Sequence, residues 1–181
     1  MADYSRERWR VCKRFLEMRS SWLTLIGENL QDDRGDILEY WRIEKSDSVI
    51  IITLQKNQLI LPQPMYRPGV GEFTFDFPGG RVPDGESPLA VVPLILKREL
   101  GIEADSIVEI TPLNTKGWAV NSSFSNQKLF GFFVQIKPSL VLSPEYVGAT
   151  YPANDSGVGD LLEVLTCLQC RALLLEWWVG R

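Results

Sequence analysis

Short segments rich in apolar and aromatic residues, separated by polar residues and glycine, occur through the first part of the chain, as they do in β-strands. Residues 22–26 and 37–43 follow this pattern. Segment 31–36 between them is rich in Asp and Gly and predicts a tight turn, so the two strands form a hairpin. Residues 9–19 fit either a short amphipathic helix or a first strand, and the pattern leaves both open.

The rest of the chain predicts more strands and two helices. The further strands are expected at residues 48–54, 58–61, 73–77, 107–110, 117–120 and 128–136. Ser87 suits the N-cap of a helix, Pro88 its first position and Gly101 its end. Residues 158–179 predict a long closing helix. This order of strands and helices predicts an α/β (α+β) sandwich with helices on both faces of a mixed sheet.

Length, charge and cysteine content narrow the class of protein. The 181 residues suffice for one domain with a substantial core and a small N-terminal extension. A net charge of -4 gives no reason to expect nucleic acid or an anionic membrane as partner. Residues 1–10 are polar, and no apolar run reaches the length of a bilayer span, so we expect no signal peptide and no membrane segment. Three cysteines form no secreted disulfide framework, and we expect a cytoplasmic protein.

Histidine is absent from the sequence, which restricts the available chemistry. A nucleophile activated by histidine and a metal site built on histidine are both excluded. A general base must then be a carboxylate, a lysine, a tyrosine or a metal-bound water, and a metal must be a hard ion held by oxygen.

Two runs flank the first predicted helix. Residues 79–86 read Gly-Gly-Arg-Val-Pro-Asp-Gly-Glu, and residues 96–102 read Leu-Lys-Arg-Glu-Leu-Gly-Ile. Together they resemble the Nudix box, G-x5-E-x7-R-E-U-x-E-E-x-G-U, in which U is aliphatic. The positions in register with that pattern are Gly80, Glu86, Leu96, Glu99, Gly101 and Ile102.

The resemblance reaches beyond the box to the ADP-ribose pyrophosphatase branch of the Nudix hydrolases. Segments that recur there in the same order are residues 21–25, 39–41, 65–71, 75–80 and 168–175. This likeness implies a Nudix-type sandwich at residues 48–181, preceded by an N-terminal hairpin extension, residues 1–47, exchanged within a homodimer. It also implies a nucleoside-diphosphate-type ligand such as ADP-ribose, which the family hydrolyses with magnesium or manganese.

The same resemblance nominates site residues. Glu99 and Glu86 would be the catalytic carboxylates, and the metal would be held by Glu99, Glu86 and the backbone carbonyl of Gly79. Substrate-binding candidates are Arg67, Glu39, Trp41 and Arg81. Each has an ordinary structural alternative, such as a loop cap for Arg67, core or dimer packing for Trp41, and a solvated charge for Arg81.

The box departs from the family pattern at the positions that hold the metal ions in the family. The family places carboxylates at i, i+3 and i+4 on one helix face, where this chain has Ile95, Arg98 and Glu99. The family's Arg position is Leu94, and Pro93 inside a helix costs about 3 kcal/mol or forces a kink. We therefore expect metal-dependent hydrolysis to be lost or strongly weakened.

Three hypotheses follow for the function. The first is a Nudix-like nucleotide-binding or interaction module without hydrolysis. The second is an active magnesium-dependent hydrolase that uses Glu99 with relocated acids, among them Asp76, Glu86 and Glu145. The third is a dimeric scaffold whose cleft is plugged by an apolar first helix.

Cys167 and Cys170 have the C-x-x-C spacing of redox pairs. The continuous apolar pattern of residues 158–179 places them inside the closing helix rather than at its start. We therefore predict a buried structural pair.

Overall fold

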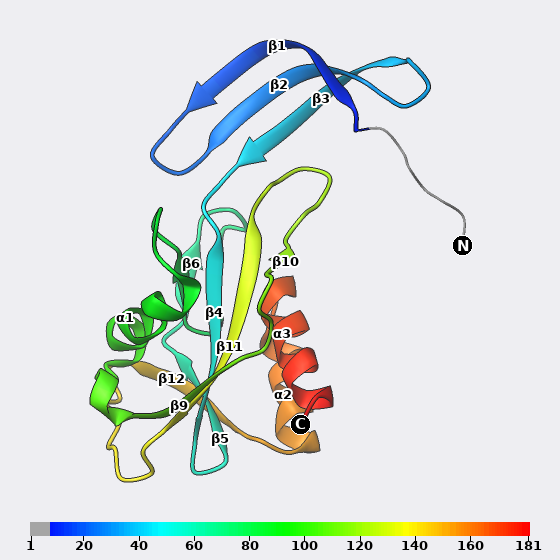
Figure 1. Ribbon diagram of the computed structural model, residues 1–181. Helices are drawn as coiled ribbons and strands as arrows, with labels where there is room; N and C mark the ends of the chain where they lie inside the picture. The colour runs from blue at the N-terminus through cyan, green and yellow to red at the C-terminus, as the bar shows by residue number, and fades with distance from the viewer. Residues whose placement is uncertain (1–7) are drawn as a thin grey trace. The chain divides into compact units, whose positions relative to one another are not determined.

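The computed structural model describes residues 8–181, which form two compact units (Figure 1). The first unit contains residues 8–46 and 119–127, and the second contains residues 47–118 and 128–181. Residues 1–7 of the expected extension lie outside the described residues. The sequence did not predict that residues 119–127 join the first unit, where the Ile43 amide donates to the Phe124 carbonyl at 2.8 Å.

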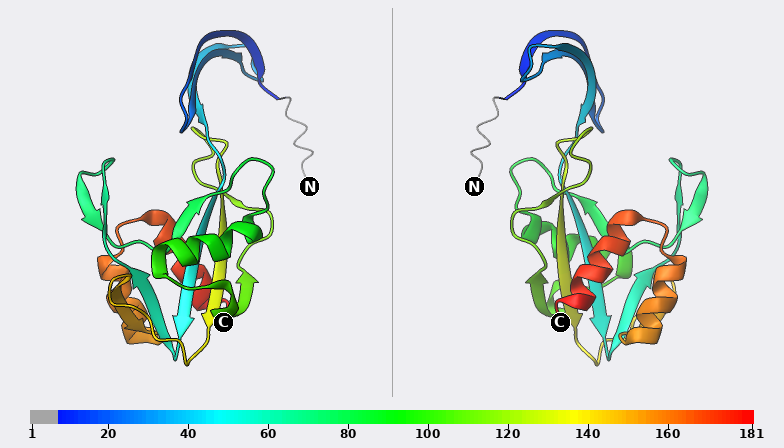
Figure 2. Two further views of the ribbon diagram at one scale, coloured as in Figure 1. Left: turned by 90° about the vertical axis from the view of Figure 1, so that its left-hand side faces the viewer. Right: turned by 90° about the vertical axis from the view of Figure 1, so that its right-hand side faces the viewer.

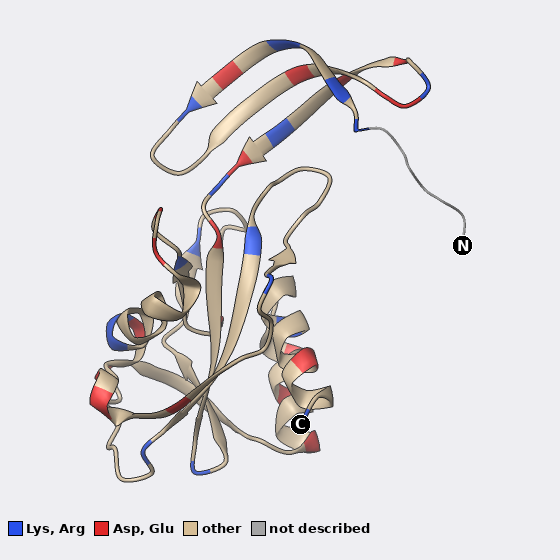
Figure 3. Cartoon of the chain, viewed as in Figure 1, with Lys and Arg blue, Asp and Glu red and all other residues tan. Residues whose placement is uncertain are grey.

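The first unit is a three-stranded antiparallel sheet, in which a further strand pairs with the predicted hairpin. Its strands are β1 (Arg10–Arg19), β2 (Thr24–Gln31) and β3 (Ile37–Glu44), in the order β1-β2-β3. Residues 9–19 thus supply a strand, which decides between the two alternatives. Acidic and basic residues intermix on these strands (Figure 3).

A buried carboxylate anchors this sheet. Glu28 is 1% exposed and lies between Arg14, at 2.7 Å, and Arg42, at 3.0 Å. Burial raises the pKa of Glu28, but the bonds to Arg42 and Arg14 outweigh burial and leave the pKa below its usual value.

The second unit is built on a seven-stranded mixed sheet. Its strands are β4 (Ser48–Gln55), β5 (Gln58–Pro62), β8 (Gly79–Arg81), β9 (Ile107–Pro112), β10 (Trp118–Ala119), β11 (Lys128–Ile136) and β12 (Val147–Pro152). The order is β10-β11-β4-β5-β12, with β8 against β4 and β9 against β11. β4 runs parallel to β11 and antiparallel to β5 and β8. A separate hairpin, β6 (Met65–Arg67) and β7 (Glu72–Thr74), stands beside this sheet.

Helices cover both faces of this sheet, as predicted (Figure 2). α1 (Pro88–Leu100) packs on one face against β4 and β5, and α3 (Leu168–Val179) packs on the other against β4 and β11. α2 (Asp155–Val164) lies against β12, and a short 3-10 turn, η1 (Ala104–Ser106), follows α1. Gly131 on β11 lets α3 approach, because a Cβ there would lie 2.1 Å from Leu173 Cδ1.

The core between α1 and the sheet fixes the box helix in place. Val49 and Ile51 of β4 pack with Val92, Ile95 and Leu96 of α1, and all five are nearly inaccessible to water. Burying each such side chain stabilises the fold by about 1.5–3 kcal/mol. The orientation of α1, and hence of its polar face, is set by this packing.

α1 begins and ends as the sequence predicts. The Ser87 side chain accepts a hydrogen bond from the Ala90 amide, Pro88 is the first residue, and Gly101 adopts the left-handed conformation at φ 65°. The helix continues through Pro93 to Leu100. It is not buried on all sides, because Leu94 is 65% exposed on its outer side.

The prediction of one closing helix is wrong. Residues 165–167 interrupt it, so that α2 ends at Val164 and α3 begins at Leu168 with Cys167 as its N-cap. No helix among residues 8–181 is long and apolar enough to cross a membrane.

Candidate functional site

The centre of the candidate site is an arginine that bridges two parts of the box. Arg98 Nη2 donates to the Gly79 carbonyl at 2.9 Å and to Glu99 Oε1 at 2.6 Å. Glu99 Oε2 in turn accepts from the Gly79 amide at 3.0 Å. The three residues form a closed ring of hydrogen bonds between the end of α1 and strand β8.

Gly80 permits this close approach of helix and strand. A Cβ at Gly80 would lie 3.2 Å from Arg98 Nη2 and 3.3 Å from the Ile95 side chain. Ile95 is 2% exposed, so it cannot move away without opening the core. The glycine of the box is therefore a packing requirement of the Arg98 arrangement.

A cleft of about 300 Å³ opens beside this ring. We call it the main cleft; its lining includes Gln63, Met65, Arg98, Glu99, Glu145 and Tyr146. A smaller hollow adjoins it, because both are lined by Gln63, Met65 and Glu99. The α1 helix therefore does not plug the cleft, contrary to the premise of the scaffold hypothesis.

The small hollow contains a second arginine–carboxylate pair. Arg67 Nη2 lies 2.6 Å from Asp76 Oδ2, and Arg67 Nε donates to the same oxygen at 2.7 Å. The Thr74 hydroxyl also donates to Asp76 Oδ2, at 3.1 Å. Arg67 is 45% exposed, so part of its guanidinium faces water beside the cleft.

The structure brings together three of the nominated residues. Glu99 and Gly79 bond to each other, and Arg67 lines the small hollow with Glu99. Glu86 is exposed in the turn before α1, where its amide donates to the Pro83 carbonyl, and it lines neither the cleft nor the hollow. Arg81 is exposed at the end of β8.

The other two nominated residues lie in the first unit. On β3 the Trp41 indole Nε1 donates to Glu39 Oε1 at 2.8 Å, and the Trp41 ring packs edge-on against Phe15 at 5.4 Å between centroids. These contacts lie on the surface of the sheet, where Trp41 is 40% exposed.

The donor atoms present do not fit a magnesium or manganese ion. Such ions require several oxygen ligands, usually including carboxylates. Of the nominated donors, Glu99 uses both oxygens on Arg98 and Gly79, and the Gly79 carbonyl faces Arg98. A guanidinium thus lies between the two expected ligands, and its positive charge opposes a cation there.

Sequence reasoning missed two features of this region. Glu145 was nominated only as one of several loose acids, yet it lines the main cleft with Glu99. Cys167 and Cys170 lie next to Asp76 in the fold. No spacing along the chain could reveal this, since the nearer cysteine is 91 positions after Asp76.

Comparison with known proteins yields one likeness and two negative results. Neither a protein-family model nor a curated protein sequence matches the chain. A crystal structure of an ADP compounds hydrolase matches with a TM-score of 0.74 at 21% sequence identity, over 97% of this chain and 97% of that one. At this identity the match establishes the fold alone, and it confirms the predicted class: the chain has an α+β sandwich with a mixed sheet, and an antiparallel sheet precedes it in the sequence.

Proposed function

We propose that the chain binds a nucleoside-diphosphate-type molecule in the main cleft and does not hydrolyse it with magnesium or manganese. The observation that carries this proposal is the position of Arg98, which donates to both Gly79 and Glu99. The guanidinium supplies there the positive charge that a divalent ion supplies in a metal-dependent pyrophosphatase.

Electrostatics favours this replacement over metal binding. Two like unit charges at about 4 Å repel by about 4 kcal/mol at an effective dielectric of about 20. Arg98 is 60% exposed, so water screens part of that repulsion. Even a third of it would weaken cation binding by about tenfold.

The same arginines suit a phosphate group. Both bonds of Arg98 described above use Nη2, and a guanidinium has five N–H donors, so donors remain for a ligand. Arg67 presents a second guanidinium in the adjoining hollow. Arginine forks bind phosphate oxygens in pairs, which supports a diphosphate as the ligand. The likeness to an ADP compounds hydrolase favours an adenine nucleotide among such molecules.

We further propose a homodimer formed through the N-terminal extension, residues 1–47. Its sheet exposes large apolar side chains, which soluble monomers seldom gather in one place. The most exposed of them are Trp9, Val11, Met18, Trp22 and Ile37.

The alternative of an active hydrolase draws on one observation. Glu99 and Glu145 both line the main cleft, so two carboxylates face the same space. If Arg98 swung into solvent, these two groups would be the ones left to hold a cation.

A paired assay tests the proposal. ADP-ribose, AMP and nucleotide sugars would be incubated with the protein in magnesium, in manganese and in chelator, while thermal unfolding is followed in the same samples. We expect no turnover, and a ligand at about 100 times its Kd should stabilise the fold by about 2.7 kcal/mol, or about 5 °C. Arg67→Ala and Arg98→Ala should reduce that gain in chelator.

Lys97→Ala is the matched control, since Lys97 is exposed and pairs with Glu103 at 3.0 Å rather than facing the cleft. Its thermal gain should equal that of the wild type. Metal-dependent turnover that Glu99→Gln abolishes would overturn the proposal in favour of the active hydrolase.

A further inference from the structure

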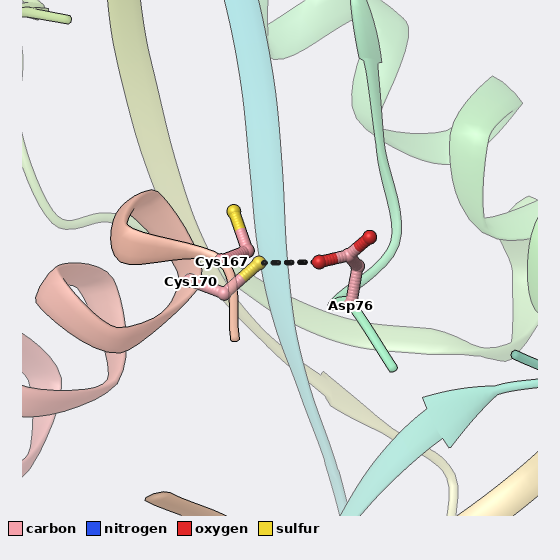
Figure 4. A group of neighbouring side chains, drawn as sticks. All are labelled: Asp76, Cys167 and Cys170. Atoms are coloured by element: carbon pink, nitrogen blue, oxygen red, sulfur yellow. Dashed lines mark hydrogen bonds between the residues drawn. The ribbon is translucent and has the colours of Figure 1, made fainter. Parts of the chain in front are cut away.

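The two cysteines at the start of α3 lie against the Asp76 carboxylate (Figure 4). Their Sγ atoms and a carboxylate oxygen of Asp76 all lie within 4.8 Å of one another. Cys167 is the N-cap of α3 and is partly exposed, whereas Cys170 is 1% exposed. The Cys170 thiol donates to Asp76 Oδ1 at 3.8 Å, as drawn in Figure 4.

We propose that Cys167 and Cys170 form a redox-active dithiol that exchanges with small-molecule disulfides, with Cys167 attacking and Cys170 resolving. This activity is inferred without reference to the proposed nucleotide binding. It rests on the placement of one accessible and one buried thiol at a helix start, beside a carboxylate that is itself held in place.

Cys167 has the surroundings of an attacking thiolate. The side chain of Cys170 lies next to its sulfur, and together with the backbone amides of Cys170 and Gln169 it favours the thiolate of Cys167. Burial and the Asp76 charge oppose these effects without cancelling them, and the pKa of Cys167 falls to about 6. At neutral pH such a cysteine is mostly thiolate, which is the nucleophilic form.

Cys170 has the opposite character. The neighbouring Cys167 sulfur and burial raise the pKa of Cys170 well above the usual range, so it stays a thiol until a base takes its proton. Asp76 Oδ1 is the nearby acceptor. The other oxygen of Asp76 is fixed by Arg67 and Thr74, which keeps Oδ1 turned toward the sulfur.

The exchange balances in two steps. The Cys167 thiolate attacks one sulfur of the small disulfide, forms a mixed disulfide and releases one small thiolate. Cys170 then passes its proton to Asp76 and attacks the Cys167 sulfur, which closes the Cys167–Cys170 disulfide and releases the second small thiolate. The two leaving thiolates take up the Asp76 proton and one from water, so one small disulfide is reduced to two thiols.

A zinc ion is the competing occupant, because two sulfurs and a carboxylate are zinc ligands. Two observations weigh against it. Structural zinc sites use four protein ligands, and this group offers three. Arg67 lies 2.6 Å from Asp76 Oδ2, so a fixed positive charge stands next to the carboxylate that a cation would need.

Oxidation of the full-length protein tests the proposal. The reduced protein would be incubated with glutathione disulfide, and free thiols, intact mass and cross-linked peptides would be measured. We expect two of the three thiols to disappear, a mass loss of two hydrogen atoms, and a peptide joining Cys167 to Cys170. Cys170→Ala should stop at the mixed disulfide and carry one glutathione on Cys167.

Cys12→Ala is the control, since Cys12 is exposed on β1. This substitution should leave the yield of the Cys167–Cys170 disulfide unchanged. In that variant, Cys167 alkylation at pH 6 should be about tenfold faster in the folded protein than in the urea-unfolded chain. The estimate combines the larger thiolate fraction with the lower intrinsic nucleophilicity of a thiolate of low pKa. This readout does not depend on whether Cys170→Ala folds.

Three results would overturn the proposal. One is the absence of an intramolecular disulfide at saturating oxidant, and another is a Cys167 alkylation rate that does not change on unfolding. The third is one zinc ion per chain in the purified protein, with both thiols released only by a chelator.

Discussion

The two arginine–carboxylate pairs beside the main cleft are nearly identical as ion pairs. Arg98 and Glu99 lie 2.6 Å apart with a carboxylate 13% exposed, and Arg67 and Asp76 lie 2.6 Å apart with a carboxylate 12% exposed. Their second partners differ. Glu99 also holds the backbone amide of Gly79, whereas Asp76 also accepts from the Cys170 thiol. The role of each pair is therefore set by what its carboxylate touches besides arginine.

In the first unit, the carboxylate of Glu28 is almost completely buried between two arginines. Glu28 has both oxygens on arginines and is 1% exposed, so no donor from a ligand can reach it. We assign Glu28 a structural role. The carboxylates of the two cleft pairs are more exposed than Glu28, so a ligand can reach them.

Breaking the buried pair should have the largest effect on stability. Glu28→Gln leaves Arg14 and Arg42 without their shared anion; because these arginines are 41% and 28% exposed and can be hydrated, the cost is about 1–2 kcal/mol. Chemical denaturation of the first unit should show this loss. Glu44→Gln is the control, since Glu44 is exposed and bonds only at the outer side of Arg42.

The same residue predicts an acid dependence. The pKa of Glu28 is lower in the folded chain than in the unfolded one, so its contribution to stability is full above the unfolded pKa, about 4.3. It should disappear as the pH falls through the folded pKa. Glu28→Gln should flatten this part of the stability curve, and an unchanged curve would contradict the assignment.

Reversing the charge at Arg98 should sharpen the contrast between the two cleft pairs. Arg98→Glu removes the cation from the expected metal position and adds a carboxylate beside Glu99, so manganese affinity should rise by at least about tenfold. Calorimetric titration with manganese measures it. Arg67→Glu is the equivalent change at the other pair and should produce a smaller rise in manganese affinity. The group beside Asp76 is the Cys170 thiol, whereas the group beside Arg98 is the Gly79 carbonyl, and manganese prefers oxygen ligands.

Neutralising each carboxylate should separate the two roles. Asp76→Asn should slow closure of the Cys167–Cys170 disulfide several-fold, because the proton acceptor of Cys170 is lost, while formation of the mixed disulfide continues. Glu99→Gln should leave both thiol steps unchanged. Quenching the thiol–disulfide exchange with acid at successive times, followed by mass spectrometry, distinguishes the two steps. Equal effects of the two variants on disulfide closure would contradict the separate roles of Asp76 and Glu99.

The smallest expected effect is a packing change at the box glycine. Gly80→Ala places a methyl group 3.2 Å from Arg98 Nη2 and 3.3 Å from Ile95, so it should displace the guanidinium and cost about 1 kcal/mol, the lower end of the range for overpacking. Gly69→Ala is the control, because a Cβ there meets nothing within 4 Å. Thermal unfolding of both variants measures the difference.

The sequence predicted the parts of the fold that depend on local signals. Ser87, Pro88 and Gly101 mark the ends of α1, and continuous apolar runs mark β4 and β11. The break before α3 was missed because residues 165–167 contain neither Gly nor Pro and continue an apolar pattern. The sequence predicted the hairpin but did not decide the third strand, because residues 9–19 carry no periodicity that separates helix from strand.

The candidate site was predictable only where a motif spans it. Glu99, Gly79 and Arg98 follow from the box, and so does the conflict of charge between them. The sequence did not predict that Arg98 would bond both expected ligands at once, since that depends on the packing of Ile95 against Gly80. The approach of Asp76 to the cysteines is set by tertiary packing and leaves no signal in the spacing.

A crystal of the wild-type protein soaked with ADP-ribose and manganese tests the central claim most directly. The account predicts diphosphate density at Arg98 and Arg67, the Arg98 bonds to Gly79 and Glu99 retained, and no anomalous manganese peak between those two residues. A manganese peak on Glu99 and the Gly79 carbonyl, with Arg98 turned into solvent, would contradict it and favour the active hydrolase.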